Sequence, residues 1–197
     1  MKVKDVFKEI FVGINLSLGS KNGEMQEVYT FNKQNIIHNT ILFNEFGYNK
    51  FKFREKYNHL PNTNLTKIKV PINIKEKYFL KFGDIVISTK KPYKVFNDII
   101  IKNDRIIATN NFIILREMIS EKYYYPYLMY YIEKVGIKKL LNESSKMNNE
   151  LSLEDIKNIE LPNIPRNQQF DDYFEVQALT RKILRAEERI EEIFKEK

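Results

Sequence analysis

Residues 151–170 read LSLEDIKNIELPNIPRNQQF and join two different kinds of sequence. Ser152 is followed three residues later by Asp155, a spacing typical of a capped helix start. Pro162 and Pro165 then prevent the helix from continuing, because proline lacks an N–H and restricts the residue before it to extended geometry. The stretch therefore predicts a short helix, an extended bridge and the start of a second helix.

The second helix is predicted to run from Arg166 to the last residue, since no glycine or proline interrupts it. Its apolar residues recur at spacings of three and four, which is the a/d pattern of a coiled coil. We call them the seam: Val176, Leu179, Ile183, Ala186, Ile190 and Ile193. So narrow a stripe suits contact with another helix. We expect a second copy, another subunit or the chain's own body as its partner.

Before about residue 120, short apolar runs alternate with turn-forming clusters, which predicts strands. The runs are VYTF (28–31), IIHNTILF (36–43), LTKIKVPI (65–72), YFLKFGDIVIST (78–89), DIIIKN (98–103), RIIAT (105–109) and FIILRE (112–117). Gly83-Asp84 predicts a turn that leads into a buried strand, and Asn103-Asp104 predicts a tight hairpin turn.

Residues 121–141 instead place tyrosine, leucine and isoleucine at helical spacing, with Pro126 suited to a first turn. We expect a helix that packs on the sheet and breaks at Gly136. Its tyrosines fit core packing better than base stacking. The predicted class is α+β: a β-rich domain with packed helices over residues 1–160, a bridge over 161–165 and a long coiled-coil helix over 166–197.

Composition narrows the function. The chain has 197 residues, of which 43% are apolar and 13% aromatic, so it is not a disordered chain. No run approaches the roughly 18 apolar residues of a membrane span, and no export signal begins the sequence. We therefore expect a cytoplasmic protein that is not bound to a membrane. The absence of cysteine and the presence of only two histidines argue against a metal site.

The net charge of +7 is concentrated in one segment. Residues 50–105 hold fourteen basic and five acidic side chains, a local excess of +9, while the rest of the chain sums to −2. Such a surface attracts polyanions, as nucleic-acid binding requires. Solvated lysines with no partner are the alternative interpretation.

Motifs of common enzyme chemistry are missing. The sequence has no Gly-x-Gly-x-x-Gly, no phosphate-binding Gly-x-x-x-x-Gly-Lys and no Asn-Pro-Pro-Tyr-like tetrad of amino-methyltransferases. It also lacks Glu-x-Lys, which restriction-type nucleases pair with an Asp to hold Mg²⁺. We therefore predict a binding protein without catalytic residues, metal or cofactor. An unrecognised nuclease or phosphodiesterase is a weaker alternative.

Three stretches, in this order, resemble the DNA specificity subunit of type I restriction-modification systems. They are YFLKFGDIVISTKKPYK (78–94), NNFIILREMISEKYYYPYLMYYIEK (110–134) and the joining stretch with its glutamines. The resemblance covers about residues 78–197. It departs from the family at Thr89-Lys90-Lys91-Pro92, where family members usually carry a glycine-rich basic loop.

The resemblance implies a target recognition domain followed by a spacer helix. Family members usually carry two of each, with the helices packed antiparallel to set the distance between two half-sites on DNA. With room for one of each, this chain would act as a half-subunit that forms a homodimer through the seam and binds a bipartite, inverted site. It would recruit a methyltransferase (modification) subunit, and a translocating restriction nuclease subunit could join. The main alternative is a protein-interaction adaptor that uses the heptad helix and binds no DNA.

Candidate DNA contacts lie in the basic segment. Lys90, Lys91, Tyr93 and Lys94 follow a strand end, where a loop can enter a groove. A second set suits phosphate contacts: Lys50, Lys52, Arg54, Lys67, Lys69 and Arg105. The two arginines could instead pair with guanine.

Overall fold

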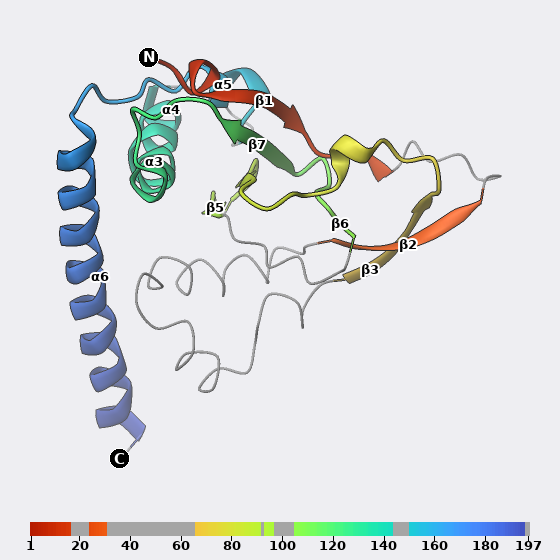
Figure 1. Cartoon of the computed structure of the whole chain (residues 1–197). Helices are drawn as coiled ribbons and strands as arrows, with labels where there is room; N and C mark the ends of the chain where they lie inside the picture. Colours follow the sequence, from red (N-terminus) through yellow and green to blue (C-terminus); the bar gives the residue numbers. More distant parts are fainter. Residues whose placement is uncertain (17–23, 31–65, 92, 97–104, 144–149, 196–197) are drawn as a thin grey trace.

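In the computed structural model, two sheets with mostly antiparallel strand pairs form the body (Figure 1). The structure describes residues 1–16, 24–30, 66–91, 93–96, 105–143 and 150–195. The larger sheet has the order β1-β7-β4-β5 and the smaller one the order β3-β2-β6. The strands are β1 (Phe7–Val12), β2 (Met25–Thr30), β3 (Thr66–Pro71), β4 (Ile85–Ser88), β5 (Val95–Phe96), β6 (Ile106–Ile107) and β7 (Phe112–Met118). Two short 3-10 turns, η1 (Val3–Asp5) and η4 (Glu76–Tyr78), complete the β-rich part.

Strands β4 and β7 lie at the centre of the larger sheet and are buried on both faces. Ile87 pairs with Ile113 in register, and the next residues along pair Val86 with Ile114. Because successive side chains point to opposite faces, Ile87 and Ile113 join one core and Val86 and Ile114 another. This accounts for the continuous apolar runs in both strands.

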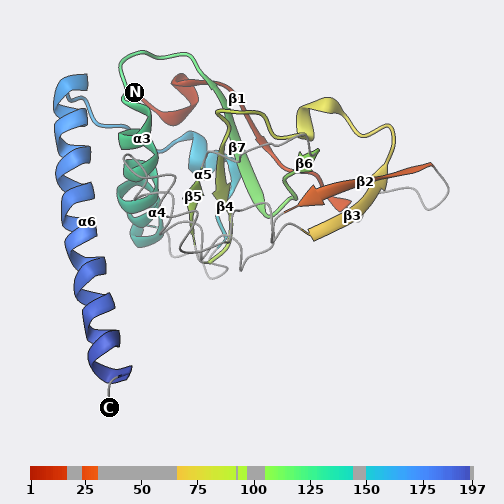
Figure 2. The same ribbon diagram turned by 60° about the horizontal axis from the view of Figure 1, so that its bottom comes forward.

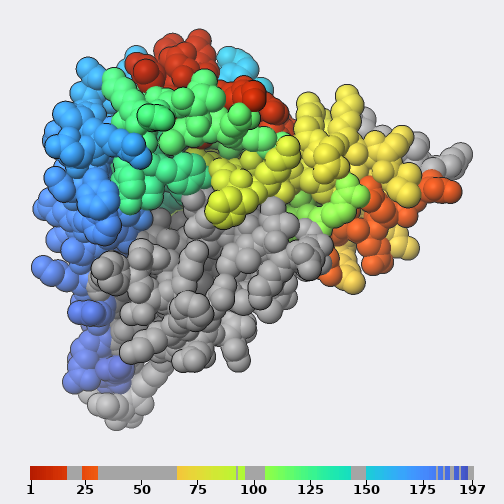
Figure 3. All heavy atoms as spheres, in the orientation of Figure 1, coloured from red at the N-terminus to blue at the C-terminus, as the bar shows by residue number. Residues whose placement is uncertain are grey.

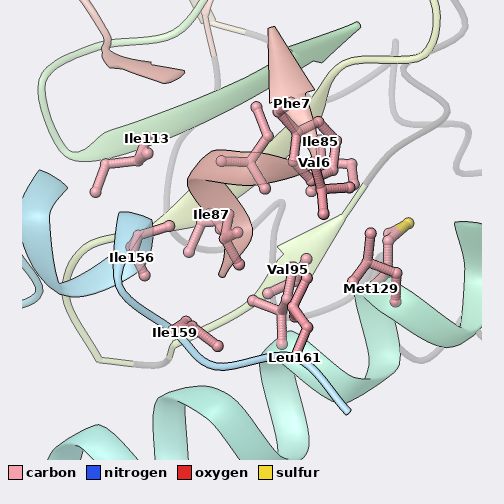
Figure 4. Close-up of a cluster of buried hydrophobic side chains, with 14 of the residues drawn as sticks. Val6, Phe7, Ile85, Ile87, Val95, Ile113, Met129, Ile156, Ile159 and Leu161 are labelled. Carbon is pink, nitrogen blue, oxygen red and sulfur yellow. The ribbon is translucent and has the colours of Figure 1, made fainter. Parts of the chain in front are cut away.

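The first of these cores lies between the larger sheet and the helices. Figure 4 shows side chains from β1, β4, β7, the helix after Pro126 and the joining stretch converging there. Leu128 and Ile132 belong to this core, so the helix packs on the sheet as predicted. It comprises α3 (Tyr125–Tyr131), a π turn η5 (Ile132–Gly136) and α4 (Ile137–Glu143).

The predicted break at Gly136 is wrong, because the backbone stays helical through η5 and into α4. Gly136 is instead a point of close approach. A Cβ built on it would lie 2.6 Å from the Cγ2 atom of Ile159, so the π turn can approach the joining stretch only without a side chain there. The tyrosines also pack rather than point to solvent as a group: Tyr123 is fully buried, and the ring of Tyr124 lies 5.2 Å from that of Phe170.

The joining stretch has the predicted parts. Helix α5 (Leu153–Lys157) begins with a capping box in which the Ser152 side chain accepts from the Asp155 N–H. The extended bridge then pairs with the N-terminus, which the sequence did not reveal: the Leu161 N–H donates to the Met1 carbonyl at 2.9 Å, and Lys2 pairs antiparallel with Glu160. The joining stretch, residues 151–170, which we call the joint, is thus part of the body.

Helix α6 (Arg166–Lys195) is a single helix of 30 residues. Figures 1 and 2 show it at one edge of the molecule, beside α3 near its start and free of the labelled elements near its end. In the described part of the chain, no helix is long and apolar enough to cross a membrane.

The sequence missed β1 and β5, because β1 mixes exposed polar residues with apolar ones and β5 has only two residues. The predicted strands at 36–43 and 98–103 and the predicted turn at Asn103-Asp104 lie outside the described residues.

Candidate nucleic-acid interface

The basic loop lies between β4 and β5, and its described residues are 90, 91, 93 and 94. Thr89, the residue before it, is held by several hydrogen bonds. The N–H and Oγ1 of Thr89 both donate to the Asn111 carbonyl, at 2.9 and 3.0 Å. The Thr89 carbonyl accepts the Leu151 N–H at 2.8 Å. The loop therefore begins at a point held both by the turn before β7 and by Leu151, two residues before α5.

The other end of the loop is held by a buried carboxylate. The Val95 N–H donates to Oε2 of Glu133 at 2.8 Å, and the Lys94 ammonium lies 3.6 Å from Oε1. Between the last residue of β4 and the residue before β5, the Ser88 N–H donates to the Lys94 carbonyl at 2.9 Å. Both ends of the loop are thus defined by the body.

The four predicted loop residues differ in their surroundings. Lys91 is exposed, whereas Lys90 forms an ion pair of 3.5 Å with Glu150 at the surface. The Lys94 side chain is only 23% exposed beside Glu133. Tyr93 packs against the first core, and burial together with the charge of Glu150 raises the pKa of its hydroxyl. Lys90 and Lys91 are therefore the cations of this loop best placed to meet a ligand, and Tyr93 and Lys94 anchor it.

The second predicted group lies on the smaller sheet. Lys67 and Lys69 are exposed on alternate positions of β3, and Lys67 is 3.8 Å from Glu27 on the neighbouring strand. Arg105, just before β6, donates to Glu76 at 3.1 Å and to Gln26 at 3.2 Å, and its guanidinium lies 3.9 Å from the centroid of the Phe79 ring. Arg105 is thus held by three neighbours, and Lys67, although exposed, also lies beside Glu27 and over the Tyr29 ring.

The two groups belong to different sheets. Figure 3 shows the surface of β2 and β3 at the end of this face opposite to α6. The structure therefore gathers Lys67 and Lys69 on β3 and Lys90 and Lys91 on the loop, as separate basic positions. Lys50, Lys52 and Arg54 lie outside the described residues.

Sequence reasoning missed a buried ion pair at the base of β4. Arg116 donates from Nε and Nη2 to the two carboxylate oxygens of Asp84, at 2.9 and 2.6 Å. It also donates to the carbonyls of Lys77 and Phe79, and the hydrogen bond with Asp84 raises the pKa of its guanidinium. The Gly83-Asp84 turn was predictable, and Gly83 has a φ of +87°, but nothing local indicated the partner of Asp84.

Gln169 fixes the start of α6. Its side chain is fully buried and makes three hydrogen bonds to the main chain. Oε1 accepts the Tyr124 N–H at 2.9 Å, and Nε2 donates to the carbonyls of Lys122 and Ile164 at 3.1 and 3.0 Å. One amide therefore links the approach to α3, the bridge and α6, and so holds the direction in which α6 leaves the body.

The seam lies further along α6 and is largely uncovered. Val176 is half-buried, whereas the four larger seam residues beyond it are between 44% and 59% exposed. They are Leu179, Ile183, Ile190 and Ile193; Ala186 is also exposed. The body thus covers the start of the helix and leaves the apolar stripe to solvent.

The described residues contain no group of three or more acidic or histidine side chains that could hold a metal ion.

Comparison with known proteins gives one informative result. No family model and no curated protein matches the sequence. Among solved structures, the chain is similar to the HsdS subunit from Thermoanaerobacter tengcongensis, with a TM-score of 0.60 and 12% sequence identity. The match covers 100% of this chain and 45% of the HsdS chain. The chain therefore spans less than half the length of that subunit, and its fold is similar to part of that subunit.

Proposed function

We propose that the protein binds double-stranded DNA sequence-specifically as a specificity subunit of a type I restriction-modification system. The observation that carries this proposal is the similarity of the entire chain to an HsdS subunit, at a TM-score of 0.60. The three sequence stretches that resemble this family also fall on structurally connected parts: β4 with its basic loop, β7 with α3, and the joint with α6. In this role the chain carries no chemistry itself.

The parts of the molecule then have separate tasks. Residues 1–160 form the target recognition domain, residues 161–165 the bridge, and residues 166–197 the helix for pairing and spacing. Two copies pair through the seam as a homodimer of half-subunits, which supplies two recognition domains for a bipartite site. The exposure of Ile183 and Ile190 supports this pairing, because a water-exposed apolar stripe is stabilised by a second helix.

The complex recruits its catalytic partners. A methyltransferase subunit modifies the site, and a restriction subunit with translocase activity can join it. The basic loop enters a groove through Lys90 and Lys91, while Lys67 and Lys69 contact phosphates. Lys50, Lys52, Arg54 and Arg105 remain candidates for further DNA contacts, with Tyr93 and Lys94 supporting the loop.

The experiment is the retention of purified protein on random duplex DNA as salt is raised. We expect the wild-type protein to bind at low salt and to elute by about 0.5 M salt, because binding releases counterions from the phosphates. Lys90→Glu with Lys91→Glu should weaken binding and reduce the slope of log affinity against log salt by about 2.

The control is Lys4→Glu with Lys138→Glu, which changes the net charge equally at two exposed positions outside the loop. If both double variants weaken binding alike, the loop is not the contact. If the wild-type protein is not retained even at low salt, the adaptor function would replace the DNA-binding one.

A further inference from the structure

We propose that Glu133 is a positioning residue that sets the conformation of the basic loop and thereby its selectivity for a DNA sequence. This inference rests on the proposed function and concerns a residue that does not itself touch DNA. Glu133 lies on the π turn η5, and its side chain is 5% exposed. Its partners on the loop side are the last loop residue, Lys94, and the first residue of β5, Val95.

The contact with Val95 is a backbone contact, so it acts on the path of the chain. Strand β5 has only two residues and pairs with β4 along one side. Glu133 Oε2 accepts the Val95 N–H at 2.8 Å, a donor that β4 does not use. A carboxylate forms a stronger hydrogen bond with an N–H than a neutral acceptor does. The helix thus fixes the place at which the loop ends.

The burial of this carboxylate has no packing advantage. Removing a carboxylate from water costs several kcal/mol unless charges and donors compensate, and an apolar side chain would fill the same space without that cost. Lys134 Nζ comes within 2.7 Å of Oε1 and Lys94 Nζ within 3.6 Å, yet Oε1 has no partner in hydrogen-bond geometry among the described residues. The compensation therefore comes from two lysines, one of which belongs to the loop.

The opposite end of the loop offers a contrast. The carboxylate of Glu150 lies 3.5 Å from Lys90, but both side chains are nearly half exposed. An exposed pair of this kind contributes little, typically under about 1 kcal/mol. Both acidic residues neutralise a lysine, but only Glu133 also holds the main chain.

The π turn gives Glu133 a second connection. Gly136, in the same turn, packs directly against Ile159 of the joint. A π turn inserts an extra residue into a helix and changes the direction of the side chains that follow it. Here one turn contacts both the end of the loop and the stretch that leads to α6.

Electrostatics and positioning predict opposite results when the charge is removed. Loss of a negative charge beside Lys94 should strengthen binding to any DNA. Loss of a positioning residue should weaken binding to the preferred sequence only. The ratio of affinities for preferred and scrambled duplexes therefore separates the two roles.

The experiment begins with the selection of duplexes from a random pool by the wild-type full chain. Affinities are then measured for the most enriched duplex and for a scrambled duplex of the same composition. Glu133→Ala should lower the ratio of the two affinities about tenfold, which is the order of one lost base-pair preference. Its affinity for the scrambled duplex should not fall. Glu133→Gln keeps an acceptor for the Val95 N–H and loses the charge, so its ratio should fall less, by about threefold.

The matched control is Glu150→Gln, which removes the same charge beside the same loop and leaves the backbone contact intact; its ratio should stay at the wild-type value. A wild-type ratio for Glu133→Ala would overturn the proposal. If Glu133→Ala fails to fold, the affinity ratio of Glu133→Gln is the test instead, and a wild-type value of that ratio would overturn the proposal.

Hydrogen exchange of the peptide that contains Val95 keeps the two proposals separate. If the wild-type chain enriches no duplex, the proposed function fails, but Glu133→Ala should still speed exchange of the Val95 amide relative to Glu150→Gln. Unchanged exchange would refute the positioning role, whether or not the protein binds DNA.

Discussion

The body of this protein buries polar side chains, whereas the far part of α6 exposes apolar ones. In the body, Asp84, Arg116 and Gln169 are almost fully buried, and each has hydrogen-bond partners. On α6, Ile183 and Ile190 are more than half exposed. Both arrangements cost free energy for a single chain in water, and the two costs are compensated in different ways.

The buried polar groups are resolved within the chain. A buried polar side chain is costly unless its hydrogen bonds are made, and Asp84, Arg116 and Gln169 each find their partners within the chain. The exposed apolar stripe has no comparable solution in the described residues. In the proposed function, a second copy of the chain covers this stripe.

The largest expected effect comes from placing charges in the seam. Ile183→Glu with Ile190→Glu should abolish the homodimer, because four carboxylates would be buried in its interface at a cost of several kcal/mol each. Sedimentation at tens of micromolar should give a dimer for the wild-type chain and a monomer for the variant. Asn167→Glu with Ala178→Glu, at exposed positions outside the seam, should leave the dimer intact. A wild-type monomer under these conditions would remove the half-subunit proposal.

The next effect concerns the buried ion pair. Asp84→Ala leaves the Arg116 guanidinium buried without its carboxylate and should lower the free energy of unfolding by about 3–5 kcal/mol. Glu76→Gln removes the carboxylate that pairs with the exposed Arg105 and should change it by less than about 1 kcal/mol. Urea denaturation measures both. Similar losses for the two variants would mean that burial does not distinguish these pairs.

A smaller loss is expected at the start of α6. Gln169→Ala leaves the Tyr124 N–H and the carbonyls of Lys122 and Ile164 without a partner and should lower the free energy of unfolding by about 2 kcal/mol. The neighbouring Gln168 is exposed, so Gln168→Ala should have almost no effect. Equal stability of the two variants in thermal unfolding would contradict the role of Gln169 in holding the helix.

The smallest effect on affinity concerns the bridge. Pro162→Gly with Pro165→Gly keeps the carbonyl of residue 162, which accepts from the Tyr123 hydroxyl, but frees the backbone. On duplexes with half-sites at different separations, the variant should bind over a wider range of spacings and keep nearly wild-type affinity for one half-site. Pro71→Gly, at the end of β3, should leave the spacing preference unchanged. An unchanged spacing range for the bridge variant would place the stiffness elsewhere, in the pairing of Lys2 with Glu160 or in Gln169.

Local signals were enough to locate the joint, the long helix and the central strands. The capping box of Ser152 and Asp155, the two prolines and the heptad spacing act within a few residues, so their effect can be read from neighbours alone. The apolar runs of β4 and β7 are equally direct, because strands buried on both faces need no alternation.

Contacts between distant residues decided the rest. Several contacts join residues far apart in sequence: the pairing of the N-terminus with the bridge, the partner of Asp84, the bonds of Gln169 to Lys122 and Tyr124, and the contact of Glu133 with Val95. The same holds for the lysines: their place after a strand end predicted a basic loop, but only the folded chain brings Glu150 to Lys90 and Glu133 to Lys94. Hydrogen bonds and ion pairs depend on separations of a few ångströms in space, and the order of residues along the chain does not specify those separations until the sheets and helices have packed.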